Sequence, residues 1–252
     1  MRIGVIGLGS MGMGAALNLL AKGHATFGCD RRESAQAEFR QAGGTAFERA
    51  ADLPERLDGV LVFVVNAAQV HDVLLGDDGC ATRLPEGAVV ICGTTMAPEA
   101  ARALGRELSE RGLLMLDAPV SGGAVGARAG TMTVMASGPA EAFERARPAL
   151  EAIAGKVWDL GAAIGTGSTV KMVNQLLAGV HIVVAAEALA LGIRAGADPN
   201  VLFEVISSSA GSSWMWQNRV PHILAGDDTP LSAVNIFVKD LGIVLAEGRA
   251  LT

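Results

Sequence analysis

The sequence predicts an α/β fold in which a doubly wound, Rossmann-type parallel sheet is followed by an all-α domain that begins with a long interdomain helix. Within the first fourteen residues, a short apolar run ends in a glycine-rich turn that opens into a helix. Further apolar runs alternate with helical segments as far as residue 161, and strand signals then stop. We therefore expect a dinucleotide-binding domain over 1–161 and a helical domain over 162–252.

Composition excludes several classes of protein. At 252 residues, half of them apolar, the chain can bury a sizeable core, and its net charge of −6 argues against a nucleic-acid partner. Its three cysteines lack metal-ligand spacing, so we expect neither a metal site nor a disulfide framework. No segment reads as a secretion signal, and the longest apolar run carries Lys171 and Glu187. We therefore expect a cytoplasmic chain with no membrane partner, in which this run forms a buried helix.

The glycine turn follows a strand predicted over Arg2–Ile6 and has the spacing G-x-G-x-x-G. Gly7 permits a tight turn, Gly9 lets the backbone approach a pyrophosphate, and Gly12 lets the helix pack on the strand. This context favours a bound dinucleotide over a purely structural turn. The predicted contacts are Gly7, Leu8, Gly9, Ser10, Met11 and Gly12.

An acidic residue, Asp30, ends a second predicted strand, 18 residues after Gly12. A carboxylate at about this spacing binds the adenosine ribose hydroxyls and repels a 2′-phosphate. Arg31 and Arg32 follow, and an arginine here could bind that phosphate or simply lie in solvent at the start of a helix over 34–42. We predict NAD as the cofactor, with NADP as the alternative, and assign Asp30 and Arg31 to its site.

Two further apolar runs, 59–65 and 88–92, have the composition of strands buried on both faces. Ligands bind at the carboxyl ends of such strands, where polar side chains follow both runs. Asn66 and the threonines could instead cap helices. The cofactor candidates at this edge are Val65, Asn66, Ala67, Gln69, Val70, Thr94 and Thr95.

The turn over 117–123 follows a strand predicted over 113–116 and ends in Ser121-Gly122-Gly123. Its successive backbone amides and one hydroxyl form the kind of concavity that holds a carboxylate. Helices over 98–111 and 140–153 and strands over 131–136 and 157–160 complete the first domain.

A helix of about 28 residues is predicted over 168–195, on the order of 40 Å long, and would form the wall of an interdomain cleft. Lys171, Asn174 and Gln175 stand at i, i+3 and i+4, so their side chains meet on one face. They suit a ligand, although Lys171 could also reach solvent and the amides could cap backbone groups. Another face is apolar and holds Val173, Leu176, Leu177, Val180 and Val184.

Four motifs in order resemble the β-hydroxyacid dehydrogenase family, which includes 3-hydroxyisobutyrate dehydrogenase and tartronate semialdehyde reductase. They are the glycine turn, the turn over 117–123, the helix segment 167–175 and the segment 239–242, and the resemblance covers nearly the whole chain. Within the family, the stretches 66–70, 213–221 and 230–244 are most similar to members that oxidise L-threonate. Trp214, Trp216 and Asn218 would account for that preference, or the tryptophans simply pack the helical domain.

The resemblance makes Lys171 the catalytic residue. It places Lys239 near the nicotinamide, and it assigns the substrate carboxylate and hydroxyls to the glycine-rich turn after Ser121 and to two amides on the long helix. Oxidation of an alcohol needs a proton acceptor beside the oxygen, and a lysine can serve if burial and a second cation, Lys239, disfavour its charged form. No metal is required. The implied substrate residues are Ser121, Gly122, Gly123, Asn174 and Gln175.

The implied reaction is oxidation of the 2-hydroxyl of a small sugar acid, L-threonate, to 2-oxo-tetronate. The alternatives are 3-hydroxyisobutyrate oxidation, tartronate semialdehyde reduction, and a non-catalytic dinucleotide-binding module, which the presence of Lys171 disfavours. Helical domains of the family pair between subunits, so we expect a homodimer or homotetramer. The family continues past the equivalent of Thr252, which predicts that this chain is truncated.

Overall fold

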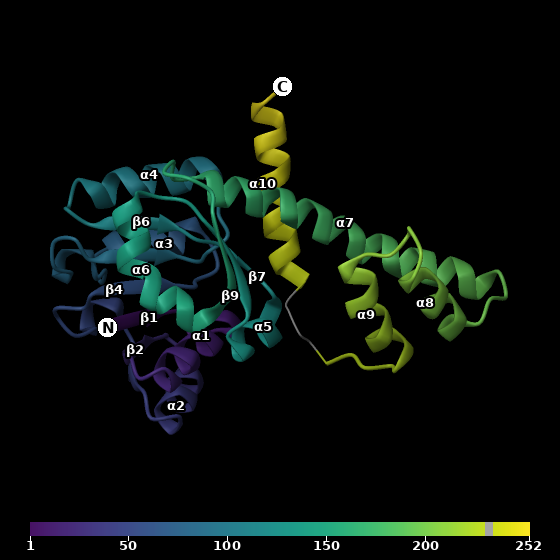
Figure 1. The fold of residues 1–252 in the computed structure, drawn as a ribbon, viewed down its shortest axis with the longest axis horizontal. Helices are drawn as coiled ribbons and strands as arrows, with labels where there is room; N and C mark the ends of the chain where they lie inside the picture. The colour runs from purple at the N-terminus through teal and green to yellow at the C-terminus, as the bar shows by residue number, and fades with distance from the viewer. Residues whose placement is uncertain (230–233) are drawn as a thin grey trace. The chain divides into compact units, whose positions relative to one another are not determined.

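The computed structural model describes residues 1–229 and 234–252 and divides into two compact units, Met1–Met172 and Val173–Thr252 (Figure 1). The first unit contains both sheets, and the second is built from helices. The boundary between them falls inside the long helix α7 (Thr166–Arg194). Residues 230–233, the start of one stretch that resembles the L-threonate-oxidising members, lie outside the described residues.

The first unit is organised around a six-stranded parallel sheet of order β3-β2-β1-β4-β5-β6. The chain winds outwards from β1 in both directions, which confirms the predicted doubly wound fold and places a topological switch point between β1 and β4. Its strands are β1 (Arg2–Ile6), β2 (Ala25–Cys29), β3 (Thr45–Phe47), β4 (Gly59–Val62), β5 (Val89–Cys92) and β6 (Leu114–Asp117).

Helices cover both faces of this sheet (Figure 1). Along β4, Leu61 enters the core on one face, whereas Val60 and Val62 enter the core on the other. Burial on both faces is why these strands read as continuous apolar runs. The first core is covered by α1 (Ser10–Ala21), α2 (Glu33–Gln41) and α6 (Ala140–Ile153), and the second by α3 (Ala67–Leu75) and α4 (Pro98–Ser109), with short 3-10 turns at Ala50–Asp52 and Ala81–Arg83.

A smaller sheet of order β7-β8-β9 joins the edge of the large one. It consists of β7 (Val120–Ser121), β8 (Met132–Ala136) and β9 (Ala154–Asp159), with α5 (Gly123–Ala129) between β7 and β8. The main chains of Asp117, at the end of β6, and Ser137, just after β8, form an antiparallel bridge with N···O distances of 2.9 and 2.8 Å. This bridge fixes the small sheet to strand β6.

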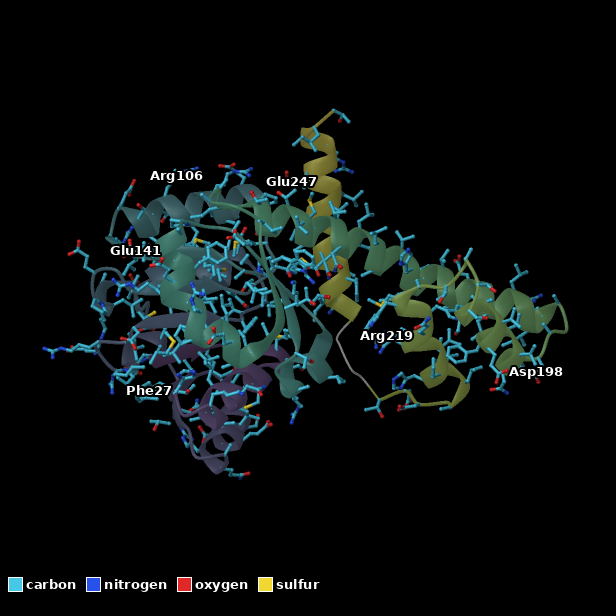
Figure 2. The ribbon with its side chains drawn as sticks, in the orientation of Figure 1. Phe27, Arg106, Glu141, Asp198, Arg219 and Glu247 are labelled. Atoms are coloured by element: carbon cyan, nitrogen blue, oxygen red, sulfur yellow. The ribbon has the colours of Figure 1, made fainter. Side chains whose placement is uncertain are left out.

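The second unit holds the rest of α7 with α8 (Pro199–Ser207), α9 (Trp214–Leu224) and α10 (Val234–Ala250). Asp198, at the turn before α8, accepts the N–H groups of Asn200 and Val201 and is therefore the N-cap of α8 (Figure 2). Trp216 is buried and stacks on Phe203 with ring centroids 6.5 Å apart. A role for Trp216 in packing the helical core is therefore confirmed.

The apolar face of α7 is exposed among the described residues. Its side chains are 41 to 54% exposed, so the expectation of a buried helix is wrong for this face. By length and composition alone α7 could cross a membrane, with a mean hydropathy of 2.1 in its most apolar window. Its polar face is the covered one, since Lys171 and Gln175 are buried. An apolar stripe shows that a face avoids water, but it does not say what covers it.

Candidate functional site

The glycine turn between β1 and α1 is shaped by close backbone packing on one side and by open space on the other. Gly7 has a φ of +91°, and a Cβ there would lie 2.4 Å from the carbonyl oxygen of Phe63. A Cβ on Gly12 would lie 1.7 Å from the carbonyl oxygen of Gly7. A Cβ on Gly9 would meet no described atom within 4 Å. The turn therefore fits the pyrophosphate of a dinucleotide over Gly9, at the N-terminus of α1.

Asp30 lies at the carboxyl end of β2 and is hydrogen-bonded directly to this turn. Its Oδ2 accepts the N–H of Leu8 at 2.8 Å, and its two oxygens also accept the guanidinium and backbone N–H groups of Arg32. Burial acts to raise the pKa of Asp30, but hydrogen bonds from Arg32 and Leu8 outweigh it and hold the pKa below the ordinary value. Arg31 instead pairs with Asp72 at 3.2 Å, so both arginines have carboxylate partners.

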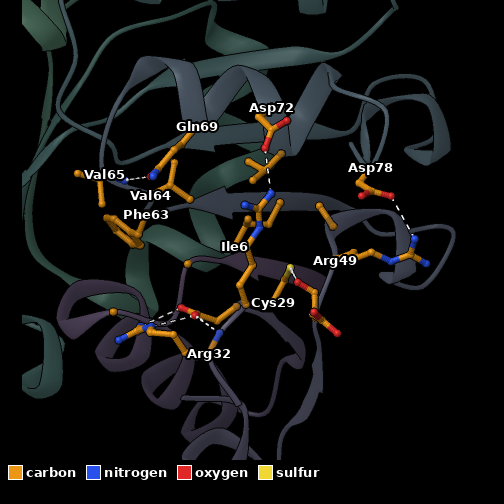
Figure 3. Close-up of a pocket in the computed structure, with 17 residues that line it drawn as sticks. Ile6, Cys29, Arg32, Arg49, Phe63, Val64, Val65, Gln69, Asp72 and Asp78 are labelled. Atoms are coloured by element: carbon orange, nitrogen blue, oxygen red, sulfur yellow. Dashed lines mark hydrogen bonds and ion pairs between the residues drawn. The ribbon is translucent and has the colours of Figure 1, made fainter. Parts of the chain in front are cut away.

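A cavity of about 610 Å³ lies at the carboxyl ends of β1, β2 and β4 (Figure 3). This volume is in the range of small-molecule and cofactor sites, and the position is the switch point of the sheet. At one end Arg49 contacts Asp52 and Asp78 at 2.7 and 3.1 Å, a cluster that the sequence reasoning missed. The predicted site residues among its lining are Gly7, Gly9, Asp30, Arg31, Val65 and Gln69.

The polar residues after β4 and β5 hold the backbone at this edge. Asn66 caps α3, because its Oδ1 accepts the N–H of Gln69 at 2.9 Å. Figure 3 shows that Gln69 Oε1 in turn accepts the N–H of Val65, at 2.9 Å. Thr94 is buried and donates to the carbonyl of Val64 at 3.1 Å. The capping alternative is thus confirmed for Asn66. Other predicted residues here are the buried Val70 and the half-buried Ala67 and Thr95.

The turn at Ser121-Gly122-Gly123 leads from β7 into α5. Gly122 and Gly123 have φ values of +125° and +61°, and both are exposed. Helix α5 lies directly against α1, since a Cβ on Gly14 would be 2.5 Å from the carbonyl carbon of Ala127. Asn18 on α1 also donates to the Ala127 carbonyl at 2.9 Å. The two helices that begin at the glycine turn and at the Ser121 turn are therefore in backbone contact.

Lys171 lies near the start of α7 and is only 7% exposed. The helix begins beside Asp117, whose carboxylate is 1% exposed and accepts hydrogen bonds from Ser168, Gly165 and Ser137. Burial raises the pKa of Asp117 above the ordinary value, and these hydrogen bonds oppose part of that rise. The first unit therefore holds two buried charged side chains at the start of α7: the carboxylate that caps the helix, and Lys171 one turn further along it.

In the second unit, the predicted polar residues form a chain of contacts between α7 and α10. Asn174 Nδ2 donates to Gln175 Oε1 at 3.0 Å, and Gln175 Nε2 donates to the Asp240 carboxylate at 2.5 Å. Lys239 lies 2.9 Å from the other oxygen of Asp240. The sequence reasoning missed Asp240, although it lies within the 239–242 motif. Gln175 therefore joins two helices, and Lys239 has a buried carboxylate beside it.

The cysteines and acidic residues offer no metal site within 1–229 and 234–252, where no group of three His, Cys, Asp or Glu side chains converges. Cys29, Cys80 and Cys92 are free thiols, and burial raises the pKa of each to about 12.

Family models match the chain in two segments. Residues 2–161 match the NAD binding domain of 6-phosphogluconate dehydrogenase, and residues 165–252 match the NAD-binding domain of NADP-dependent 3-hydroxyisobutyrate dehydrogenase. The L-threonate dehydrogenase of Cupriavidus necator is 58% identical over 247 residues, which cover 98% of this chain and 83% of that protein.

Solved structures agree with these matches. A crystal structure described as 3-hydroxyisobutyrate dehydrogenase from Salmonella typhimurium is 47% identical and has a TM-score of 0.92, over 99% of this chain and 87% of that one. Psf3, solved in complex with NADP+ and 2-OPP, is 26% identical with a TM-score of 0.90, over 97% and 86% of the two chains. The chain belongs to the NAD(P)-dependent hydroxyacid dehydrogenases related to 3-hydroxyisobutyrate dehydrogenase, as its four motifs predict.

Proposed function

We propose that this chain oxidises the 2-hydroxyl of L-threonate to 2-oxo-tetronate, with NAD as the hydride acceptor and Lys171 as the proton acceptor. The similarity to the Cupriavidus necator enzyme supports the substrate. The observation that carries the mechanism is Lys171 itself, a buried lysine near the start of α7 at the position of the family motif.

The chemistry requires two transfers from the alcohol. The bound nicotinamide dinucleotide supplies a hydride acceptor. The hydroxyl proton goes to neutral Lys171, and in the reverse direction protonated Lys171 returns it to the carbonyl oxygen. The exposed backbone of the Ser121-Gly122-Gly123 turn binds the substrate carboxylate and so determines which carbon reacts. Asn174 and Gln175 are assigned to the substrate hydroxyls, and Lys239 to the nicotinamide end.

The preference for NAD is assigned to Asp30. Its carboxylate is ionised at neutral pH, because its pKa lies below the ordinary value, and it lines the cavity beside the glycine turn. An anion there accepts hydrogen bonds from the ribose hydroxyls and repels a 2′-phosphate. Arg31 and Arg32 lie beside it, each held by a carboxylate, and make NADP the secondary cofactor.

We further propose a cytoplasmic homodimer or homotetramer. The exposed apolar face of α7 supports it, since a contiguous apolar face on a chain is typical of a protein interface. Light scattering is expected to give at least twice the mass of the chain, and a monomer would contradict the proposal.

A second candidate substrate is 3-hydroxyisobutyrate, which the Salmonella typhimurium structure favours by its description. The deciding experiment measures NADH formation with L-threonate, D-threonate, D-glycerate and 3-hydroxyisobutyrate. We expect L-threonate to be selected, and turnover of 3-hydroxyisobutyrate alone would overturn the substrate assignment while leaving the family intact.

The Lys171→Ala variant tests the mechanism in the same assay. It is expected to bind NADH as the parent chain does and to lose turnover by at least about a hundredfold, the lower end of the range for general acid–base groups. Lys156→Ala, which changes an exposed lysine on β9, is the matched control and should keep its rate. Near-normal turnover in Lys171→Ala would exclude Lys171 as the proton acceptor.

A further inference from the structure

The first turn of α7 is held by side chains from distant parts of the chain. Asp117 accepts the backbone N–H groups of Gly165 and Ser168 at 3.0 and 2.9 Å and the Ser168 hydroxyl at 2.7 Å. Ser137 Oγ accepts the N–H of Gly167 at 3.0 Å and donates to Asp117 at 3.4 Å. These N–H groups have no partner within the helix, so residues from β6 and the end of β8 supply the cap that α7 lacks locally.

This cap is buried and closely packed. Asp117, Ser137 and Ser168 are each 1% exposed or less. A Cβ on Gly167 would lie 2.4 Å from the carbonyl oxygen of Met135 and 2.7 Å from that of Asp117. The helix start therefore rests directly on the strand backbones, and the network leaves no room for it to shift.

Lys171 is one helical turn beyond the cap. It stands at i+3 from Ser168 and at i+4 from Gly167, so it lies on the same side of α7, about 5 Å further along the axis. Both Ser168 and Lys171 are buried, as this shared orientation requires. Asp117 holds the first turn of α7 in place, and this determines where Lys171 lies one turn later.

Asp117 also begins the segment that ends in the Ser121 turn. The next residue, Ala118, donates its N–H to the carbonyl of Cys92 on β5 at 2.9 Å, and the Pro119 carbonyl accepts the N–H of Met135 at 2.9 Å. The main chain from Asp117 to Ser121 is therefore pinned to strands on both sides. One residue connects the start of α7 to the proposed carboxylate-binding turn, entirely within the first unit.

We propose that Asp117 is a positioning residue that sets Lys171 relative to the Ser121-Gly122-Gly123 turn, an inference that rests on the proposed function. Four donors point at its carboxylate, from Gly165, Ser137 and twice from Ser168, and a carboxylate can accept all of them. An asparagine keeps one oxygen for the two N–H groups, but its NH2 group must donate to the Ser168 hydroxyl and reverse that hydrogen bond, and the negative charge at the start of α7 is lost. The helix start would shift, and a displacement of about 1 Å can cost on the order of a hundredfold in rate.

The test compares Asp117→Asn, the milder Ser168→Ala, and Thr169→Val as a control. Thr169→Val removes a hydroxyl from the same turn that donates to the Gly165 carbonyl at 2.9 Å and makes no bond to Asp117. We expect kcat to fall about a hundredfold in Asp117→Asn and about tenfold in Ser168→Ala, with the dissociation constant for NADH unchanged and Thr169→Val normal. Amide hydrogen exchange should become faster at Gly165, Gly167 and Ser168 in the first two variants only, which reports on the cap without any turnover.

Lys171→Ala separates failure of this inference from failure of the proposed function. If Lys171→Ala keeps its turnover, the proposed function fails. If Lys171→Ala is inactive while Asp117→Asn and Ser168→Ala keep the parent kcat, only the positioning role fails. In the Lys171→Ala background, Asp117→Asn should cause no further loss of residual turnover, because its effect acts through the missing lysine. If Asp117→Asn instead lowers the residual turnover of Lys171→Ala by the same factor as in the parent chain, Asp117 supports the fold in general and the inference is overturned.

Discussion

Arg32 donates three hydrogen bonds to the carboxylate of Asp30. Its Nη2 lies 2.9 Å from Oδ2, and its Nε and backbone N lie 3.0 and 2.9 Å from Oδ1. With the Leu8 N–H, four donors fill the roughly four lone-pair positions of the carboxylate. The Arg32 side chain is 61% exposed and that of Asp30 is 10% exposed, so Arg32 is the partner that can move. In the NAD site that we propose, a ribose hydroxyl would displace part of Arg32 to reach Asp30.

Replacing Arg32 by Ala is expected to raise the kcat/KM ratio of NAD over NADP about tenfold, or ~1.4 kcal/mol. The change frees acceptor positions on Asp30 and removes a guanidinium that can meet a 2′-phosphate. Asp30→Ser should lower the same ratio, and Asp77→Asn, an exposed acid outside the cavity lining, should leave it unchanged. An unaltered ratio in Arg32→Ala would contradict the assignment.

The stability of the chain should depend on the charge of Asp30. Because the folded-state pKa lies below the ordinary value of 3.8, the contribution of this group is present above about pH 4 and is lost as the pH falls through the lower folded pKa. Asp30→Asn should lose roughly 1 kcal/mol of unfolding free energy at pH 7. Urea unfolding at pH 7 and pH 3 should show that the difference from the parent narrows in acid; a constant difference would argue against an ionisation effect.

Two glycines of the same turn should respond differently to alanine. Gly12→Ala places a Cβ against the Gly7 carbonyl and is expected to destabilise the fold by about 3 kcal/mol, because backbone must move. Gly9→Ala meets no described atom and should fold normally while weakening NADH binding. Thermal unfolding and fluorescence titration measure the two effects. Equal losses of stability would show that the space above Gly9 is not free.

The three cysteines should be inert in the folded chain. Their pKa values of about 12 leave roughly one thiol in ten thousand ionised at pH 8, and only the thiolate reacts. A disulfide reagent at pH 8 is expected to label no thiol in the native protein and all three in urea. Fast native labelling, which would point first to Cys29 because it lines the cavity, would contradict this.

Local patterns were sufficient to predict most of the first unit. The helix over 140–153 was predicted at its observed limits, because proline, capping and periodicity signals are read within a few residues. Strand β3 was missed, since Thr45–Phe47 is three residues long and only partly buried. Strand β9 begins at Ala154, directly after α6, where no turn signal marks the change.

The site was harder to predict where partners are distant in the chain. The sequence identified the 117–123 turn, but the hydrogen bonds of Asp117 reach across 48 and 51 residues to Gly165 and Ser168. The same holds for Gln175, which contacts Asp240 across 65 residues. Residue spacing reports on neighbours along a helix or strand, whereas these contacts depend on how β6 and β8 meet the start of α7 in the first unit and on how α7 meets α10 in the second.

The backbone contact between α1 and α5 fixes the distance between the two turns at which these helices begin. With Gly14 against Ala127 and Asn18 bonded across the same crossing, the two helices approach as closely as their main chains allow. The glycine turn and the Ser121 turn, which we propose bind the phosphates and the substrate carboxylate, begin these helices, so the contact sets the distance between the two turns. Engineering for longer hydroxy acids should leave this span alone and enlarge the opposite end of the substrate, since a larger residue at Gly14 would separate both turns at once.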